Sequence, residues 1–174
     1  HPMIFKSGWD WIKKHFNTRW YFSLIIIFVV LQIFLFGEFR SHRFLLNDFN
    51  VYYKAAGRIV QGENLYRGDI DGFYKYKYSP TASLYFIPFS IFPVLVAKLL
   101  YWFFISILIC FGFFLGVKII LPEFLNEPPS KINTTILISA FVLGVCLERE
   151  IHLGQVNHLL LVLFMSVFYL HSRG

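Results

Sequence analysis

The amino-acid sequence predicts an all-α membrane protein, a polytopic bundle of transmembrane helices. Apolar residues make up 57% of the 174 residues and charged residues only 15%, whereas about 25% of residues are charged in ordinary soluble domains. Aromatic residues reach 21%, which suits lipid-facing surfaces with interfacial belts. Residues 20–37 carry no charge and would form a helix of about 27 Å, enough to cross a bilayer core.

The N-terminal part divides into three segments. Residues 1–19 combine tryptophan with lysine and arginine, which is typical of a juxtamembrane segment at the cytoplasmic face. The uncharged run 20–37 follows as the first span. Residues 38–80 are a polar segment, too long to be a simple turn, and we expect them to form an outer loop.

An amphipathic helix is expected inside this outer loop. Apolar residues recur there at the i, i+3, i+4 spacing of a helix with one buried face. This pattern predicts an interfacial helix over residues 49–61 that lies on the membrane surface. Asn47 or Asp48 can cap its start, and Gly62 can end it.

Prolines shape the next apolar segment, residues 81–92. Pro80 and Pro93 bound it and Pro88 breaks it. A helix of this length reaches about 18 Å, too short to cross comfortably, so we expect a short re-entrant or interfacial helix. Further spans are expected at residues 94–121, 132–147 and 156–170.

Lysine and arginine favour cytoplasmic loops, and this sets the expected orientation. With a cytoplasmic N-terminus, and with 81–92 not crossing, the loop 38–80 and the polar stretch EREIHLGQVNH at 148–158 both face outside. Seven Lys or Arg residues in 38–80 oppose this orientation, but a long loop translocates largely regardless of charge. If 81–92 crosses instead, the second polar stretch moves to the cytoplasm.

Charge and cysteine content favour contact with membrane lipids and argue against nucleic acid and a zinc site. The net charge of +6 fits basic residues that flank spans and meet anionic headgroups, and no nucleic-acid-binding module is visible. Cys110 and Cys146 lie in apolar runs without zinc-type spacing. Asp69 and Asp71 are expected to be solvated turn residues, with a divalent-ion site as the alternative. We therefore expect no metal site and no cofactor.

Three segments stand out together: NDFNVYYKAAGRIVQGENLY at 47–66, YKYSPTASLYFIPFSIFP at 76–93 and GQVNHLLLVLF at 154–164. In this order they resemble glycosyltransferase family 87, the polyprenyl-phosphate-mannose-dependent membrane mannosyltransferases and their relatives, which have the GT-C fold. The shared pattern is Asp-Phe-x-x-Tyr, Gly-x-x-Leu-Tyr, Tyr-x-Pro and Gly-Gln-x-Asn. Thr81 stands where the family usually has a second proline. The resemblance covers about residues 20–173.

The resemblance implies a fold and a place in a longer protein. Members of the family are much longer than 174 residues, so residues 1–174 are expected to be the N-terminal part of one multi-span, GT-C-like membrane domain. The C-terminal portion would lie in another segment.

The resemblance also implies that Asp48 is the catalytic base, because such enzymes carry their catalytic aspartate in the first outer loop. A carboxylate can take the proton of the acceptor hydroxyl that attacks the anomeric carbon. Inversion needs one base on the face opposite the leaving group. Considered alone, Asp48 also fits a helix cap.

Binding a sugar phosphate would need cations, amides and aromatic faces. Basic side chains neutralise phosphate charge, amides bind sugar hydroxyls, and tyrosines stack on sugar or prenyl groups. Headgroup contact, helix capping and an interfacial position are the alternative roles of these residue types. For Arg149 the alternative is an internal ion pair with Glu148 or Glu150, and for His152 it is a structural role. The expected donor-binding residues are Tyr52, Arg58, Tyr66, Lys75, Tyr78, Arg149, His152, Gln155 and Asn157.

The expected function is an inverting glycosyltransferase of the cytoplasmic membrane. It would transfer mannose or a similar hexose or pentose from a polyprenyl-phosphate donor to a lipid or glycan acceptor on the outer side. A transporter or flippase of lipid-linked intermediates is the second hypothesis, although no internal repeat is visible. A non-enzymatic membrane scaffold, which would not need Asp48, is the third.

Overall fold

The computed structural model describes residues 2–67, 71–120 and 126–172. Within these ranges the chain is helical and has no strand, which confirms the predicted all-α class. The helices are α1 (Pro2–Thr18), α2 (Phe22–Arg40), α3 (Asn47–Val60), the short 3-10 helix η1 (Gly72–Tyr74), α5 (Pro80–Leu84), α6 (Ile87–Ser90), α7 (Val94–Ile120), α8 (Pro129–Leu153) and α9 (Asn157–His171).

Two of the described helices are long and apolar enough to cross a membrane: α2 with 19 residues and α7 with 26 over Val94–Ile119, each with a mean hydropathy of 2.4. α8 is a third candidate if its segments Pro129–Gly144 and Cys146–Leu153, which meet at 63°, count as one span. α9 is apolar but has only 15 residues. The chain is therefore a helical membrane protein with two or three candidate spanning helices in its described part.

Some helix ends differ from the predicted spans. α2 begins at Phe22 and ends at Arg40, later at both ends than the expected span 20–37. α8 continues beyond the expected 132–147 to Leu153, so the first half of the polar stretch is helical. Glutamate and arginine are good helix formers, and the helix ends only at the first residue that adopts a left-handed backbone, Gly154.

Residues 81–92 do not form the single short helix that we expected. A turn at Tyr85 and Phe86 divides them between α5 and α6. Pro80 and Pro88 each stand in the first turn of their own helix, where a missing N–H costs nothing, whereas a proline inside a helix breaks it. Both short helices pack on α3.

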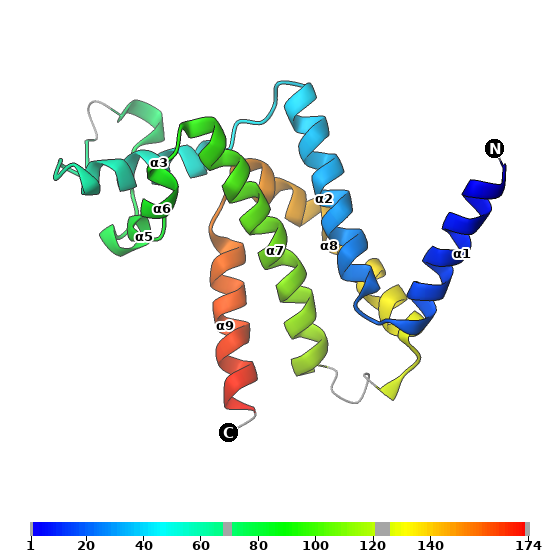
Figure 1. Ribbon diagram of the computed structural model, residues 1–174. Helices are drawn as coiled ribbons and strands as arrows, with labels where there is room; N and C mark the ends of the chain where they lie inside the picture. Colours follow the sequence, from blue (N-terminus) through cyan, green and yellow to red (C-terminus); the bar gives the residue numbers. More distant parts are fainter. Residues whose placement is uncertain (1, 68–70, 121–125, 173–174) are drawn as a thin grey trace.

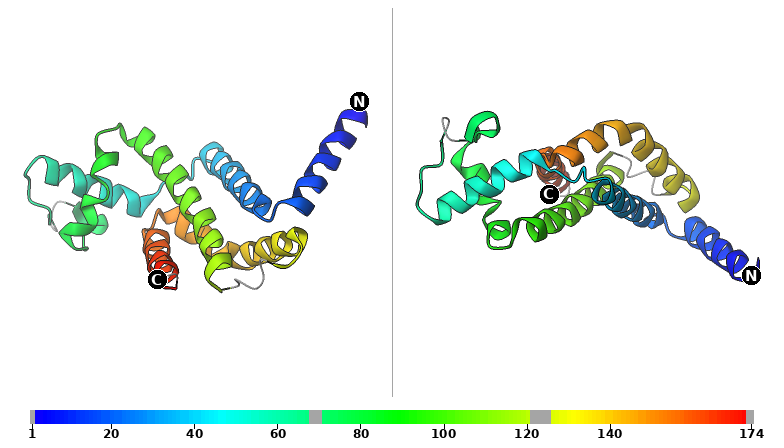
Figure 2. Two further views of the ribbon diagram at one scale, coloured as in Figure 1. Left: turned by 60° about the horizontal axis from the view of Figure 1, so that its bottom comes forward. Right: turned by 90° about the horizontal axis from the view of Figure 1, so that it is seen from above.

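The ends of the long helices gather on two sides (Figure 1). The C-terminal end of α2, the N-terminal end of α7 and the turn between α8 and α9 lie toward α3. The opposite ends of α2, α7 and α9 point to the lower part of the view. Two further views show α1 at one extreme of the molecule and the group of α3, α5 and α6 at the other (Figure 2). The polar outer loop and the α8–α9 turn therefore share one end of the molecule.

Asn133 of α8 anchors the N-terminal helices. Its side chain is fully buried and accepts a hydrogen bond from the Ser23 N–H at 3.0 Å. It also donates to the carbonyls of Phe16 at 2.7 Å and Arg19 at 2.9 Å. The carbonyl oxygen and the amino group of Asn133 thus both have hydrogen-bond partners, as a buried amide requires.

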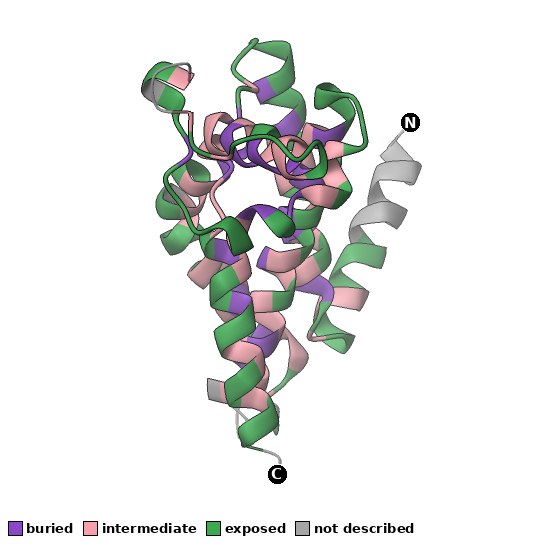
Figure 3. Ribbon diagram, turned by 90° about the vertical axis from the view of Figure 1, so that its left-hand side faces the viewer, coloured by how far each residue is buried: buried purple, intermediate pink, exposed green. Residues whose placement is uncertain are grey.

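Buried residues concentrate where α3 meets α7 and the α8–α9 turn (Figure 3). Aromatic rings fill this region. Phe34 of α2 stacks on Trp102 at 5.9 Å between centroids, and Phe49 of α3 stacks on Tyr101 at 4.6 Å. The core thus lies beside the polar end of the molecule, where it fixes the positions of α3, α7 and the α8–α9 turn relative to one another.

Candidate functional site

α3 places Asp48 in its first turn. The helix begins at Asn47, and Leu46 occupies the cap position with a left-handed backbone, φ 45° and ψ 58°. Since Leu46 has no polar side chain, the helix lacks a side-chain cap and Asp48 does not act as one. A non-glycine residue in this conformation costs about 1 to 3 kcal/mol, which the burial of Leu46 offsets.

The α8–α9 turn contains the motif GQVN and packs on the start of α3. Gly154 has φ 73°, and its N–H and that of Gln155 each donate to the Glu150 carbonyl at 3.1 Å, as in a Schellman turn. A Cβ on residue 154 would lie 3.0 Å from the Phe49 Cβ and 3.3 Å from the Leu46 Cβ. Glycine is needed here both for its backbone and for this close approach.

Tyr101 of α7 holds the same turn from another side. Its buried hydroxyl donates to the carbonyls of Gly154 at 3.2 Å and Gln155 at 3.1 Å. Its ring stacks on Phe49. One residue of α7 therefore joins α3 to the α8–α9 turn.

Four polar side chains meet at this junction: Asp48 of α3, Glu150 of α8, Gln155 of the turn and Asn157 of α9. The Asn157 Nδ2 donates to Glu150 Oε2 at 2.7 Å and to Gln155 Oε1 at 2.8 Å. With the Gln155 amide turned over, its nitrogen instead donates to both Glu150 oxygens at 3.0 and 2.9 Å, so Gln155 contacts Glu150 in either orientation. Gln155 also lies near enough to Asp48 to lower the pKa of its carboxyl. We call these four residues the carboxamide cluster.

The surroundings of Asp48 strengthen it as a base. Partial burial raises the pKa of the Asp48 carboxyl, the Gln155 side chain lowers it, and the nearby Glu150 carboxylate raises it. The net direction is upward. A carboxylate with a raised pKa holds an abstracted proton more firmly, which is what a general base requires.

Tyrosines form a wall beside the carboxamide cluster. The Tyr52 ring lies 4.9 Å from the Tyr78 ring and 4.5 Å from the Phe86 ring, between centroids. Burial, followed by the Tyr78 hydroxyl, raises the pKa of Tyr52, so Tyr52 stays a neutral hydroxyl at physiological pH. A cavity of about 350 Å³ lies between this wall and α9, lined by Tyr52, Tyr78, Ser79, Ala82, Tyr85, Phe86, Gln155, Val156, Asn157, Leu159, Leu160 and Leu163.

No family model, curated protein or solved structure matches this chain. The resemblance to glycosyltransferase family 87 therefore rests on the sequence motifs, and membership stays a prediction. What the structure adds is that Asp48, Tyr52, Tyr78, Gln155 and Asn157, all expected site residues, lie around one cavity or in contact with its lining.

Two other expected donor-binding residues hold the outer loop together. The Arg58 guanidinium pairs with both carboxylate oxygens of Asp71, with Nη1 2.6 Å from Oδ2. It also donates to the Leu65 carbonyl at 3.3 Å. The Tyr66 hydroxyl donates to the Tyr78 carbonyl at 2.9 Å. These contacts tie the segment after α3 back to that helix and support the tyrosine wall.

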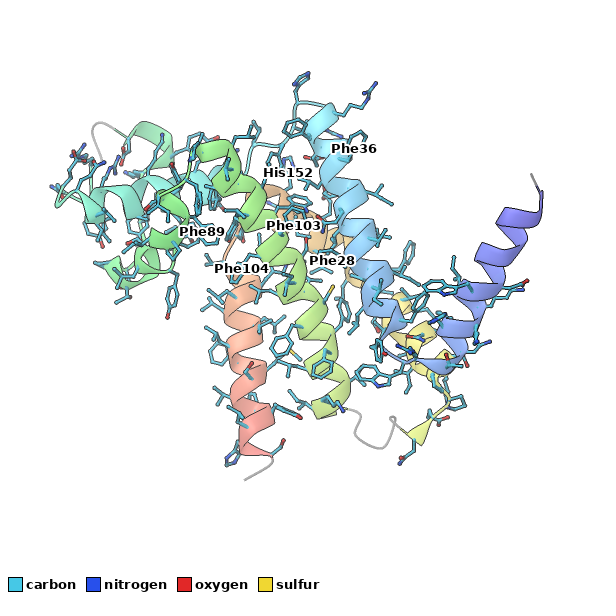
Figure 4. All side chains as sticks on the ribbon, viewed as in Figure 1. Phe28, Phe36, Phe89, Phe103, Phe104 and His152 are labelled. Carbon is cyan, nitrogen blue, oxygen red and sulfur yellow. The ribbon has the colours of Figure 1, made fainter. Side chains whose placement is uncertain are left out.

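His152 joins α8 to α2 (Figure 4). Its Nδ1 lies 2.9 Å from Glu38 Oε2, and Glu38 is only 5% exposed. Arg43 approaches the other oxygen at 3.8 Å. His152 and Arg43 thus supply partners that a buried carboxylate needs. Lys75 and Arg149, two other expected donor-binding residues, have exposed side chains.

The described residues include no group of three His, Cys, Asp or Glu side chains that could hold a metal ion. Of the acidic pair considered from the sequence, Asp71 is engaged by Arg58, and Asp69 lies outside the described residues.

An apolar groove of about 400 Å³ lies between α7, α8 and α9. His158 lines it and is buried, with no hydrogen-bond partner for Nδ1 among the described residues. His158 also lines a smaller cavity beside Tyr101 and Gln155. The groove is lined by Leu108, Ile109, Gly112, Phe113, Gly116, Val117, Thr135, Ile136, Ser139, Leu143, Leu147, His158, Leu161, Val162 and Met165.

Glu150, Tyr101 and Glu38 were not predicted from the sequence as site residues. For Glu150 a signal existed: a glycine four residues after a helical glutamate predicts a Schellman turn that folds the following residues back onto it. For Tyr101 and Glu38 there was no such signal, because their partners are distant in the sequence and lie on other helices.

Proposed function

We propose that this protein is an inverting membrane glycosyltransferase that uses a polyprenyl-phosphate sugar as donor. The acceptor would be a hydroxyl of a lipid or glycan on the outer side of the cytoplasmic membrane. The observation that carries the proposal is the meeting of Asp48 with the Gln155–Asn157 turn, because two motifs from opposite ends of the sequence come together beside one cavity.

The proposed step exchanges one bond for another. The acceptor oxygen forms a bond to the anomeric carbon while the bond from that carbon to the phosphate oxygen breaks. Polyprenyl phosphate leaves with the bonding electron pair, and Asp48 takes the proton of the acceptor hydroxyl. The anomeric configuration inverts because the base and the leaving group stand on opposite faces.

The cavities match the parts of such a donor. The tyrosine-lined cavity offers amides and a neutral Tyr52 hydroxyl to sugar hydroxyls and aromatic faces to the ring. The apolar groove between α7, α8 and α9 could take a prenyl chain. Of the expected phosphate-binding cations, Lys75 and Arg149 have exposed side chains.

Substitution of Asp48 tests the proposal in membranes that contain the protein, with a radiolabelled polyprenyl-phosphate sugar. Asp48→Asn keeps the size of the side chain and removes the proton acceptor. Turnover should fall by about 10²- to 10⁴-fold, the usual weight of general-base catalysis. Asp48→Ala should be equally inactive and still fold, because α3 does not use Asp48 as its cap.

Asp10→Asn, on the exposed face of α1, is the matched control and should leave turnover unchanged. Normal turnover in the Asp48→Asn protein would overturn the catalytic assignment. If labelled lipid changes leaflet without sugar transfer, the protein is a flippase and not a glycosyltransferase.

A further inference from the structure

Two basic side chains at the end of the molecule away from α3 lie against aromatic rings. The Lys118 Nζ lies 5.7 Å from the centre of the Trp20 ring and 5.9 Å from the centre of the Phe114 ring. The Arg19 guanidinium carbon lies 5.9 Å from the centre of the Tyr21 ring, and its Nη1 donates to the Tyr21 hydroxyl at 2.8 Å. We call Arg19, Trp20, Tyr21, Phe114 and Lys118 the cation–aromatic patch.

The patch joins the α1–α2 connection to the C-terminal end of α7, in the lower part of Figure 1. Trp20 and Phe114 stack at 5.7 Å between ring centroids, and the Trp20 and Tyr21 rings meet edge to face at 6.1 Å. The buried Asn133 amide donates to the Arg19 carbonyl at 2.9 Å, which fixes the backbone from which the patch begins. The rings and cations are therefore preorganised, which lowers the cost of binding a ligand.

Neither cation of the patch has a carboxylate partner in the described part of the chain. Arg19 is exposed and Lys118 half-buried. Lys131, which also precedes a long helix, differs because it pairs with Glu127 at 2.8 Å. A cation on an aromatic ring keeps its full charge, so the patch presents two uncompensated positive charges.

An exposed apolar surface adjoins these charges. The Phe111 ring, one turn before Phe114 in α7, stacks on Phe114 at 5.9 Å between centroids and is 41% exposed. Both α2 and α7 are long and apolar enough to cross a membrane, so the charges stand at the end of a lipid-facing surface. A ligand that joins an anionic phosphate to an acyl chain complements both parts.

We propose that the cation–aromatic patch binds the headgroup of an anionic phospholipid, with an acyl chain along Phe111, in the leaflet at the N-terminal end of α2. A zwitterionic phosphatidylcholine fits less well, because its own ammonium group meets two cations and rings that those cations already cover. The inference does not depend on the proposed enzymatic function.

Native mass spectrometry of the purified chain in detergent tests the proposal, because it resolves single bound lipids. Phosphatidylglycerol is the probe, and phosphatidylcholine with the same acyl chains is the reference. Arg19→Gln and Lys118→Gln should each weaken binding of the first phosphatidylglycerol about fivefold, the effect of one basic residue near an anionic membrane surface. Lys131→Gln is the matched control and should leave this affinity unchanged, because Glu127 already pairs with that charge.

Ring variants separate a built site from net charge. Trp20→Leu and Tyr21→Leu keep every charge but remove a ring under a cation, so each should weaken phosphatidylglycerol binding about two- to fivefold. Tyr21 is exposed, so its variant decides the question even if Trp20→Leu does not fold. Equal affinity of the wild type for the two lipids would overturn the inference, as would an equal loss in Lys118→Gln and Lys131→Gln or no loss in Tyr21→Leu. Inorganic phosphate that binds as tightly as phosphatidylglycerol would show an anion site without a lipid role.

Discussion

Gly154 is the residue on which the geometry of the site depends most closely. Gly154→Ala would need a left-handed backbone and would bring a methyl group to 3.0 Å from the Phe49 Cβ. The backbone alone costs about 1 kcal/mol, and displacement of α3 adds to it, so we expect a loss of about 2 to 4 kcal/mol. Thermal unfolding in detergent measures this loss.

Gly62→Ala separates the cost of the left-handed backbone from the cost of the close contact with α3. Gly62 has φ 67°, but no heavy atom lies within 4 Å of the position that a Cβ would occupy there, so its replacement should cost only the backbone contribution of about 1 kcal/mol. Equal destabilisation by both substitutions would mean that the contact of α3 with the turn contributes nothing.

Three of the four residues of the carboxamide cluster were singled out from the sequence. Asp48, Gln155 and Asn157 were recognised through motifs, and their proximity then appeared in the structure. Tyr101 could not be recognised, because in the sequence it is one aromatic residue within an apolar helix. Its hydroxyl gains its role only from two carbonyls on a turn far along the chain.

Among the elements, the outer loop depends on the Arg58–Asp71 pair, in which both side chains are 12% exposed. Asp71→Asn should cost about 1 to 2 kcal/mol of local stability and raise trypsin cleavage at the exposed Lys75 and Lys77 roughly tenfold.

Arg58 lowers the pKa of Asp71, so the pair is intact above the ordinary aspartate pKa of about 4 and is lost only as pH falls through the lowered value. The difference between the two proteins should therefore persist down to about pH 5.

Glu63→Gln is the control for this element. It removes the more exposed Glu63–Arg67 pair at 2.9 Å, which should contribute little because surface ion pairs are worth about 0 to 1 kcal/mol. Equal cleavage rates in wild type and Asp71→Asn would show that the pair does not hold the loop.

Apolar runs and helical spacing were sufficient to predict most elements. The helix expected over 49–61 is α3, which begins two residues earlier, at Asn47. The same local rules failed for residues 81–92, where proline inside the segment starts a new helix. They also placed the end of α8 too early, at residue 147, because the apolar run stops there, whereas nothing before Gly154 ends the helix.

For the whole molecule, the expected orientation can be tested by labelling single cysteines with a membrane-impermeant maleimide, after Cys110 and Cys146 are replaced by alanine. Asn64→Cys, exposed in the loop after α3, should react from outside in intact cells, because the basic N-terminal segment favours the cytoplasm. Asn126→Cys is exposed just before α8, which in Figure 1 starts on the side away from α3, and it should react only after permeabilisation. The reverse pattern would place Asp48 in the cytoplasm.

The sequence predicted that α3 and the α8–α9 turn lie on the same side only if residues 81–92 do not cross the membrane. A count of apolar residues does not decide whether they cross. In the structure, α5 and α6 pack on α3, and the chain enters α7 from the same end at which it left α2 (Figure 1).

The bend in α8 has a consequence for the surrounding lipid. The segment Pro129–Gly144 before the bend reaches about 24 Å, and α9 about 22 Å, against a hydrocarbon core of about 30 Å. If both cross, the bilayer beside them must thin by several ångströms, while α7, at about 40 Å, must tilt in the same membrane. The resulting hydrophobic mismatch would change sign between neighbouring helices, because the short α9 packs along the long α7.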